Sequence, residues 1–104
     1  MEETRTWETQ PTFYLTIASL GLAEALNSKN PDAAHCRAKT LPDFLDQAGQ
    51  NLKSVPELFC SLGLEMIKDT QDYFMSLLST LPELSSALDA LVRFKQTLES
   101  LKTR

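Results

Sequence analysis

Apolar residues recur every three or four positions through most of this 104-residue chain, which is the spacing of one face of an α-helix. The pattern is clearest near the carboxyl end, where charged and polar residues occupy the positions between. The apolar stripe there consists of Leu84, Ala87, Leu88, Leu91, Phe94, Leu98 and Leu101. Only three glycines are present, which is few for a turn-rich β domain. We therefore expect an all-α fold.

Proline-containing stretches indicate where the helices begin. A Ser or Thr stands two residues before a proline at four places, and these hydroxyl residues are Thr9, Thr40, Ser54 and Thr80. A hydroxyl at the N-cap accepts a backbone N–H of the first turn, and proline is tolerated there because its missing N–H would have no helical partner. Glu57 and Glu83 each lie three residues after such a hydroxyl, as in a capping box.

The second segment raises an alternative. Asn30 and Pro31 predict its start, and an apolar stripe then continues without interruption past Pro42. Either Thr40 caps a new helix, or one helix continues with a kink at Pro42. We prefer the kinked helix because the stripe is unbroken over Ala34, Ala38, Leu41, Leu45, Ala48 and Leu52.

These signals predict one domain, residues 1–104, with helices at about 10–27, 31–52, 55–79 and 81–102. The architecture expected is a four-helix bundle of antiparallel, up-down topology. In the third helix we expect an inner side made of Phe59, Leu62, Met66, Tyr73, Phe74 and Leu77.

The first helix differs from the others because its apolar residues occur on every side and Glu24 is its only charge. Its apolar stretch of about sixteen residues is short of the roughly twenty that span a membrane. A helix that is apolar all round is usually buried all round, so we expect it to pack against a further protein. The contact surface expected consists of Trp7, Phe13, Tyr14, Ile17 and Leu20. For Trp7, a hydrophobic staple at the start of the helix is the alternative interpretation.

Charge and cysteine usage exclude several classes of protein. The net charge is −4 and the ten basic residues are scattered, whereas a nucleic-acid binder presents a basic stripe. The first ten residues are acidic and polar, unlike a signal peptide. We therefore expect a cytoplasmic protein, bound to neither membrane nor nucleic acid, with Cys36 and Cys60 reduced.

No catalytic, metal-binding or cofactor-binding set emerges from the sequence. His35 and Cys36 are adjacent, but neighbours on a helix point about a hundred degrees apart, and the partners of a catalytic pair normally come from separate parts of a fold. A zinc site needs three or four ligands, and the chain has one His and two distant Cys. The row Glu65, Asp69 and Asp72 lacks the Glu-x-x-His pairs of a di-metal bundle and is interpreted as a solvated face.

Three stretches resemble the N-terminal helical portion of a bacterial family, catalogued as a domain of unknown function, whose members look like zincin-type metallopeptidases. They are "WETQPTFYL" from Trp7, "LPDFLDQAGQNL" from Leu41 and "VPELFCSLGLE" from Val55, and "ALVRFKQTLESL" from Ala90 is similar to the helix that follows. The H-E-x-x-H zinc helix of that family has no counterpart here. The resemblance implies a helical lobe without the catalytic part of the enzyme.

Together these observations predict a non-enzymatic helical domain that acts through packing or protein–protein contact. It is expected to be a fragment or reduced relative of a larger zincin-like protein. In isolation, the first helix is expected to drive self-association into a homo-oligomer. The alternative is a stand-alone adaptor or chaperone that holds a partner helix.

Overall fold

The computed structural model describes residues 10–52 and 55–102, and all regular structure in these two ranges is α-helical. The four helices are α1 (Pro11–Asn27), α2 (Pro31–Asn51), α3 (Glu57–Leu77) and α4 (Leu84–Lys102). The all-α prediction is confirmed, and the first two helices have the expected bounds to within one residue. The third and fourth helices are shorter than expected, by two residues at each end of α3 and by three at the start of α4.

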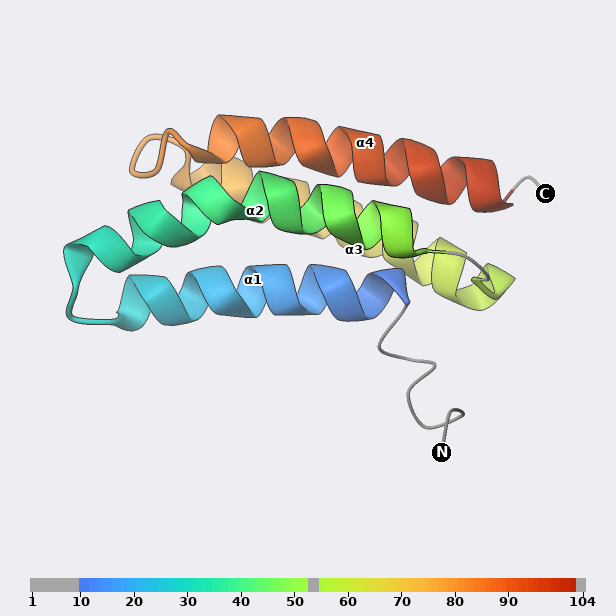
Figure 1. Cartoon of the computed structure of the whole chain (residues 1–104), viewed down its shortest axis with the longest axis horizontal. Coiled ribbons are helices and arrows are strands. Elements are labelled where there is room, and N and C mark those ends of the chain that lie inside the picture. Colours follow the sequence, from blue (N-terminus) through green and yellow to red (C-terminus); the bar gives the residue numbers. More distant parts are fainter. Residues whose placement is uncertain (1–9, 53–54, 103–104) are drawn as a thin grey trace.

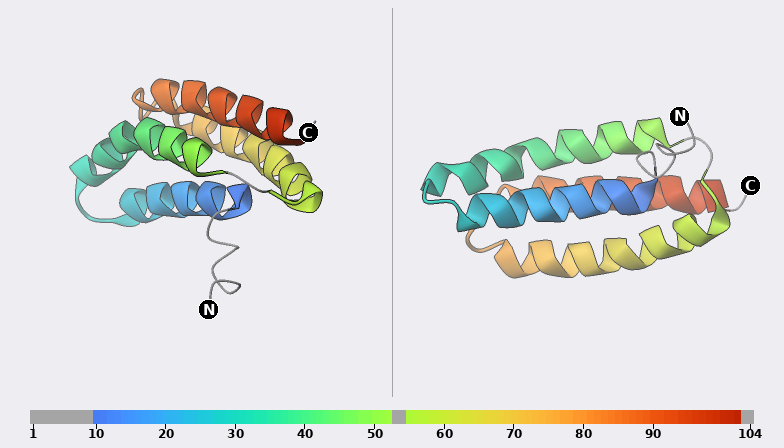
Figure 2. Two further views of the ribbon diagram at one scale, coloured as in Figure 1. Left: turned by 45° about the vertical axis from the view of Figure 1, so that its right-hand side comes forward. Right: turned by 90° about the horizontal axis from the view of Figure 1, so that it is seen from below.

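The helices form a four-helix bundle in which successive helices reverse direction (Figure 1). Helix α1 contacts α2 and α3, while α4 contacts α2 and α3 from the opposite side. Figure 2 shows the same arrangement from below, with α1 between α2 and α3 and with α4 behind it. Helices α2 and α3 therefore lie diagonally opposite each other, and α2 lies beside the parallel helix α4. The apolar stripes are compatible with more than one order of neighbours, so they do not predict this arrangement.

Two of the predicted stripes form the core as expected. The six residues of the second stripe are all buried, five of them in α2 and the sixth, Leu52, directly after it. In α4 the buried stripe residues are Leu84, Ala87, Leu91, Phe94 and Leu98. Burying an aliphatic or aromatic side chain contributes about 1.5–3 kcal/mol, which makes these stripes the main source of stability.

The inner side predicted for α3 is wrong in its rotation. Of the six residues expected there only Phe74 is fully buried, and Leu62 is 40% exposed. The buried line instead follows Cys60, Gly63, Ile67, Thr70 and Phe74. The physical reason is the close approach at Gly63, where an added Cβ would lie 3.0 Å from both Leu98 Cδ1 and Pro11 Cγ. The buried line therefore combines small residues with Ile67 and Phe74, while Met66, Tyr73 and Leu77 pack against the core partly buried.

Helix α2 runs as one helix through Pro42, as preferred from its stripe. Its start is capped as predicted, because the Asn30 side chain accepts a hydrogen bond from the backbone N–H of Asp32 at 3.0 Å. Thr40 caps nothing and donates its hydroxyl to the carbonyl of Arg37. Pro42 has no N–H to offer the carbonyl of Ala38, and Figure 1 shows the axis of α2 bending in its middle part.

The capping box expected at Thr80 and Glu83 is wrong. A capping box requires the Glu83 side chain to accept the N–H of Thr80, but that N–H donates to the carbonyl of Leu77 at 3.0 Å. Residues 78–83 form tight turns around the buried side chain of Leu81, and α4 begins only at Leu84. Because Leu81 is buried in the core, the chain turns before α4, and the Glu83 side chain contacts His35 of α2 instead of Thr80.

Two further start signals fall outside the described residues, namely Thr9 for the first helix and Ser54 for the third. Helix α1 begins at Pro11, directly after the buried Gln10. Helix α3 begins at Glu57 after Pro56, whose carbonyl accepts the N–H of Cys60.

Candidate functional site

The outward side of α1 carries exposed apolar surface, and α3 likewise exposes Leu58, Leu62 and Met75. Leu15, Ala18 and Leu22 face the core, and the opposite side presents Leu20, which is 54% exposed, and Ile17, which is 42% exposed. Phe13 and Glu24 continue this line at helical spacing. We call Phe13, Ile17, Leu20 and Glu24 the α1 outer face.

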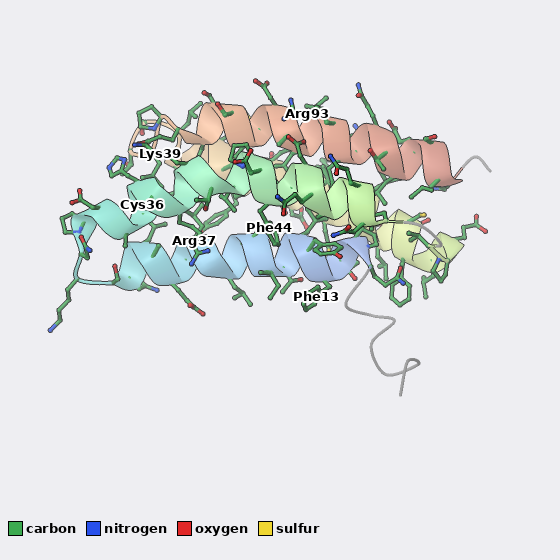
Figure 3. The ribbon with its side chains drawn as sticks, in the orientation of Figure 1. Phe13, Cys36, Arg37, Lys39, Phe44 and Arg93 are labelled. Carbon is green, nitrogen blue, oxygen red and sulfur yellow. The ribbon has the colours of Figure 1, made fainter. Side chains whose placement is uncertain are left out.

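The contact residues predicted from the sequence have different positions in the fold. Ile17 and Leu20 lie on the exposed surface as expected. Tyr14 turns toward α2, where its ring meets Phe44 edge-to-face with centroids 6.1 Å apart. Phe13 is half-buried and lies on the side of α1 away from α2, while Phe44 points from α2 toward α1 (Figure 3). Trp7 lies outside the described residues.

A groove of about 520 Å³ lies between α1 and α3 and adjoins the α1 outer face. Its walls are predominantly apolar. They are formed by Leu15, Thr16, Ser19, Leu20 and Ala23 of α1 and by Met66, Asp69, Thr70 and Tyr73 of α3. We call this the α1–α3 groove. Periodicity alone does not predict it, because the groove depends on how α3 is rotated against α1.

Thr70 is the polar residue most deeply set in the α1–α3 groove. It is only 4% exposed and lines the cavity, and its hydroxyl makes no hydrogen bond to any described residue. By contrast, Thr16 of α1 and Thr97 of α4 each donate their hydroxyl to the backbone carbonyl four residues before them. The Thr70 hydroxyl is therefore open to a group that enters the groove.

On its other side, α1 borders a smaller hollow shared with α2. This hollow has a volume of about 330 Å³ and is lined by Ile17, Ala18, Arg37, Thr40, Leu41 and Phe44. Arg37 lies against Gly21 of α1, where its Nε would be 3.4 Å from an added Cβ (Figure 3). The α1 outer face is thus a ridge between two depressions, and the only guanidinium beside it within the described chain is on the α2 side.

Charge is divided unequally between the two halves of the bundle. Helices α1 and α3 together contain five carboxylates, Glu24, Glu57, Glu65, Asp69 and Asp72, and one cation, Lys68. Helices α2 and α4 contain five carboxylates and five cations. The excess negative charge of the four helices therefore lies in the half of the bundle that forms the α1–α3 groove.

His35 contacts a carboxylate rather than its neighbour Cys36. Its Nδ1 lies 2.8 Å from Oε2 of Glu83. The field of the Glu83 backbone N–H and the hydrogen bond from His35 hold the pKa of the Glu83 carboxyl below its ordinary value. The other carboxylate oxygen of Glu83, Oε1, is buried without a hydrogen-bond partner among the described residues. This pair joins α2 to the turn before α4 and brings no nucleophile with it.

The two cysteines are both free and lie in different environments. Cys36 is exposed on α2, whereas Cys60 is buried in α3. Burial raises the pKa of the Cys60 thiol, which keeps it protonated and unreactive at neutral pH. Neither thiol combines with other side chains into a metal site: in residues 10–52 and 55–102, His, Cys, Asp and Glu form no cluster of three or more suited to a metal ion.

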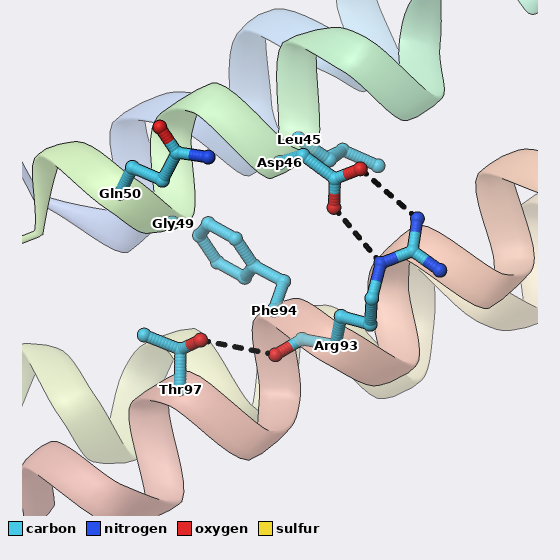
Figure 4. A pocket seen from close by; sticks show the side chains of 7 residues that line it. All are labelled: Leu45, Asp46, Gly49, Gln50, Arg93, Phe94 and Thr97. Carbon is cyan, nitrogen blue, oxygen red and sulfur yellow. Dashed lines mark hydrogen bonds and ion pairs between the residues drawn. The ribbon is translucent and has the colours of Figure 1, made fainter.

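A third depression, of about 460 Å³, lies between α2 and α4 (Figure 4). Asp46 and Arg93 stand at its edge and form two parallel hydrogen bonds, Nε to Oδ1 and Nη2 to Oδ2, each 3.0 Å long. The Asp46 hydrogen bond raises the pKa of the Arg93 guanidinium. Because these charges satisfy each other, the depression presents no free charge from this pair to a ligand.

Comparison of the chain with protein-family models, with curated proteins and with solved structures gave no match. Among the described helices, none combines the length and apolarity needed to cross a bilayer. Function is therefore inferred from the surface of the bundle itself.

Proposed function

We propose that this chain is a non-catalytic helical domain that works by protein–protein contact through the α1 outer face. The observation that carries the proposal is the pair of exposed side chains Ile17 and Leu20 on a helix whose opposite side is fully buried. Contiguous exposed apolar surface beside a groove is typical of interaction sites. Charged and polar residues would otherwise be expected at such positions of a solvent-facing helix.

The partner has two possible origins, which correspond to two forms of the protein. As a helical lobe of a larger zincin-like protein, the domain would pack against the remainder of that protein. As a stand-alone adaptor, it would hold a helix of another protein or a second copy of itself. The reading frame of the natural gene discriminates between the two forms, since continuation into an H-E-x-x-H motif would support the first.

Site-specific photocrosslinking tests the contact directly. The photoreactive residue p-benzoylphenylalanine would replace Leu20 in one variant and Val92 in a matched control. Val92 is an exposed apolar residue of α4, 45% exposed, on a helix that forms no part of the α1 outer face. In the native host, position 20 is expected to give a discrete crosslinked protein species that position 92 does not give. Equal crosslinking at both positions, or none at position 20, would contradict the proposal.

The non-catalytic part of the proposal has its own test. The purified chain is expected to show no peptidase turnover on a mixed peptide library, with or without added Zn²⁺. Turnover that purifies with the chain and depends on the added metal would contradict it.

A further inference from the structure

The α1–α3 groove has the length and lining of a site for a short helical segment. Its wall residues extend from Leu15 to Ala23 on α1 and from Met66 to Tyr73 on α3. At 1.5 Å per residue, the α1 wall is about 12 Å long and the α3 wall about 10.5 Å, so each spans about two helical turns. A helix lying along it would place three apolar side chains, at positions i, i+3 or i+4, and i+7, between Leu20 and Met66.

The acidic groups at the groove occur on α3, while hydroxyl groups come from both helices, from Thr16 and Ser19 of α1 and from Thr70 and Tyr73 of α3. Asp69 lies in the wall itself, and Glu65 and Asp72 follow the same side of α3 as exposed residues. We call Glu65, Asp69 and Asp72 the acidic rim. Thr70, a residue only 4% exposed, contributes a hydroxyl that has no partner among the described residues.

We propose that the α1–α3 groove binds an amphipathic helix of another protein whose apolar stripe is flanked by Lys or Arg. This inference rests on the proposed function and specifies the chemistry of the partner. The apolar stripe of the partner covers Leu20, Met66 and Tyr73, and its basic side chains reach the acidic rim. Complementary charge of this kind steers association and fixes the register of a docked helix.

Charge also argues against a second copy of this chain as the occupant. The described residues of α1 include no Lys or Arg, and α3 has only Lys68. Two copies that met through this side would bring two acidic rims together. Like charges placed opposite each other oppose association, so a basic partner is favoured over self-pairing.

Binding of model peptides tests the inference. The probes are three fluorescein-labelled peptides of about 18 residues, a length at which an amphipathic helix forms readily on a surface. The first has Leu on one face and Lys on the other, the second has the same Leu positions with Glu in place of Lys, and the third is a scrambled Leu/Lys sequence. Anisotropy titrations with the full chain are expected to show that the first peptide binds about tenfold or more tightly than the other two. Its advantage over the Leu/Glu peptide should shrink as salt is raised to about 0.5 M.

A pair of charge reversals locates the binding. Asp69→Lys and Asp89→Lys change the net charge of the protein equally, and both residues are exposed, on α3 and α4 respectively. Asp69→Lys is expected to weaken binding of the Leu/Lys peptide about fivefold or more, while Asp89→Lys changes it by less than about twofold. Leu20→Glu, which alters an exposed position, is expected to weaken binding of both the Leu/Lys and Leu/Glu peptides. Circular dichroism confirms that each variant is folded.

Several outcomes would overturn the inference. Equal binding of the Leu/Glu peptide would show that the groove accepts an apolar helix without regard to charge, and the proposed function would survive. Equal weakening by Asp69→Lys and Asp89→Lys would show attraction to the whole protein rather than to the groove. If none of the peptides bound, the inference would be wrong. The crosslinking experiment at position 20 tests the proposed function independently of these peptides. A dimer in sedimentation velocity that Leu20→Glu abolishes would identify a second copy as the occupant.

Discussion

The Nδ1 atom of His35 lies 2.8 Å from Oε2 of Glu83, and this contact joins residues 48 positions apart. It fixes the turn between α3 and α4 against the first turns of α2. The sequence suggested that Glu83 would cap its own helix, but in the fold this carboxylate bonds a different helix. The consequences of this contact are measurable.

Stability should depend on the ionisation of Glu83. Because its folded-state pKa is lowered, the carboxylate contributes stability that is fully present above its ordinary pKa of 4.5 and is lost as the pH falls through the lower folded-state value. In urea unfolding, Glu83→Gln is therefore expected to be less stable than the wild type at neutral pH. The difference should shrink as the pH falls below 4.5. Glu99→Gln, at an exposed α4 position without an ion pair to a described residue, is the control. A difference for Glu83→Gln that stays constant with pH would contradict the prediction.

Alanine should have opposite effects at two glycines. At Gly63, a Cβ would lie 3.0 Å from Leu98 Cδ1 and from the Pro11 ring, both of which are buried. Overpacking should outweigh the better helix propensity of alanine, so Gly63→Ala is expected to lower the free energy of unfolding by about 1–2 kcal/mol. At Gly49, the nearest contact is an ordinary 3.7 Å to Phe94 Cδ2, and Gly49→Ala is expected to raise that free energy by about 0.5–1 kcal/mol. Urea denaturation measures both, and shifts of the same sign would contradict the close approach at Gly63.

The two predicted N-caps should differ in their mutational cost. Asn30 accepts the N–H of Asp32, so Asn30→Ala is expected to destabilise the protein by about 1 kcal/mol. Thr80 is exposed and its side chain bonds to no described residue, so Thr80→Ala is expected to change stability by less than about 0.5 kcal/mol. Thermal unfolding followed by circular dichroism would measure both variants. If Thr80→Ala lost as much stability as Asn30→Ala, this would indicate that Thr80 does act as a helix cap.

Two adjacent residues of α3 test the corrected rotation of that helix. Phe74 is fully buried, whereas Met75 is 62% exposed. Phe74→Ala is expected to lower the free energy of unfolding by about 3–5 kcal/mol, enough to unfold a marginally stable domain. Met75→Ala is expected to change it by no more than about 0.5 kcal/mol.

A milder substitution keeps this test informative if Phe74→Ala does not fold. Phe74→Leu retains much of the apolar volume and should lose less stability than the alanine variant. Unfolding free energies from urea titrations provide the comparison. If Met75→Ala cost as much as Phe74→Leu, the assignment of the buried side of α3 would be wrong.

Local signals predicted the helices well where the chain contains a capping residue with a following proline and a regular apolar stripe. Asn30 and Pro31 predicted the start of α2, and the unbroken stripe through Pro42 predicted one continuous helix. Both features act within a few residues along the chain, through a cap hydrogen bond and through the 3.6-residue period. The same local rule failed at Thr80, because burial of Leu81 and the bond from His35 to Glu83 depend on other helices.

The candidate site was only partly predictable for the same reason. The apolar excess of α1 indicated a contact surface, and the structure leaves Ile17 and Leu20 on it exposed. It turns Tyr14 to Phe44, however, because the side chain of α2 that faces this position is aromatic. Residues Asp69 and Thr70 received no role at this surface from the sequence, since their place in the groove depends on the rotation of α3.

By itself the sequence determined that the fold is all-α, that α2 begins at Pro31 after the cap Asn30 and continues through Pro42, and that α1 has more apolar surface than a solvent-facing helix needs. These properties follow from spacing and capping, which involve only near neighbours along the chain. The tertiary structure alone decided the order of helices around the bundle, the buried side of α3 and the α1–α3 groove. Those depend on side-chain volumes at contacts between distant segments, and the absence of a Cβ at Gly63 is the clearest example.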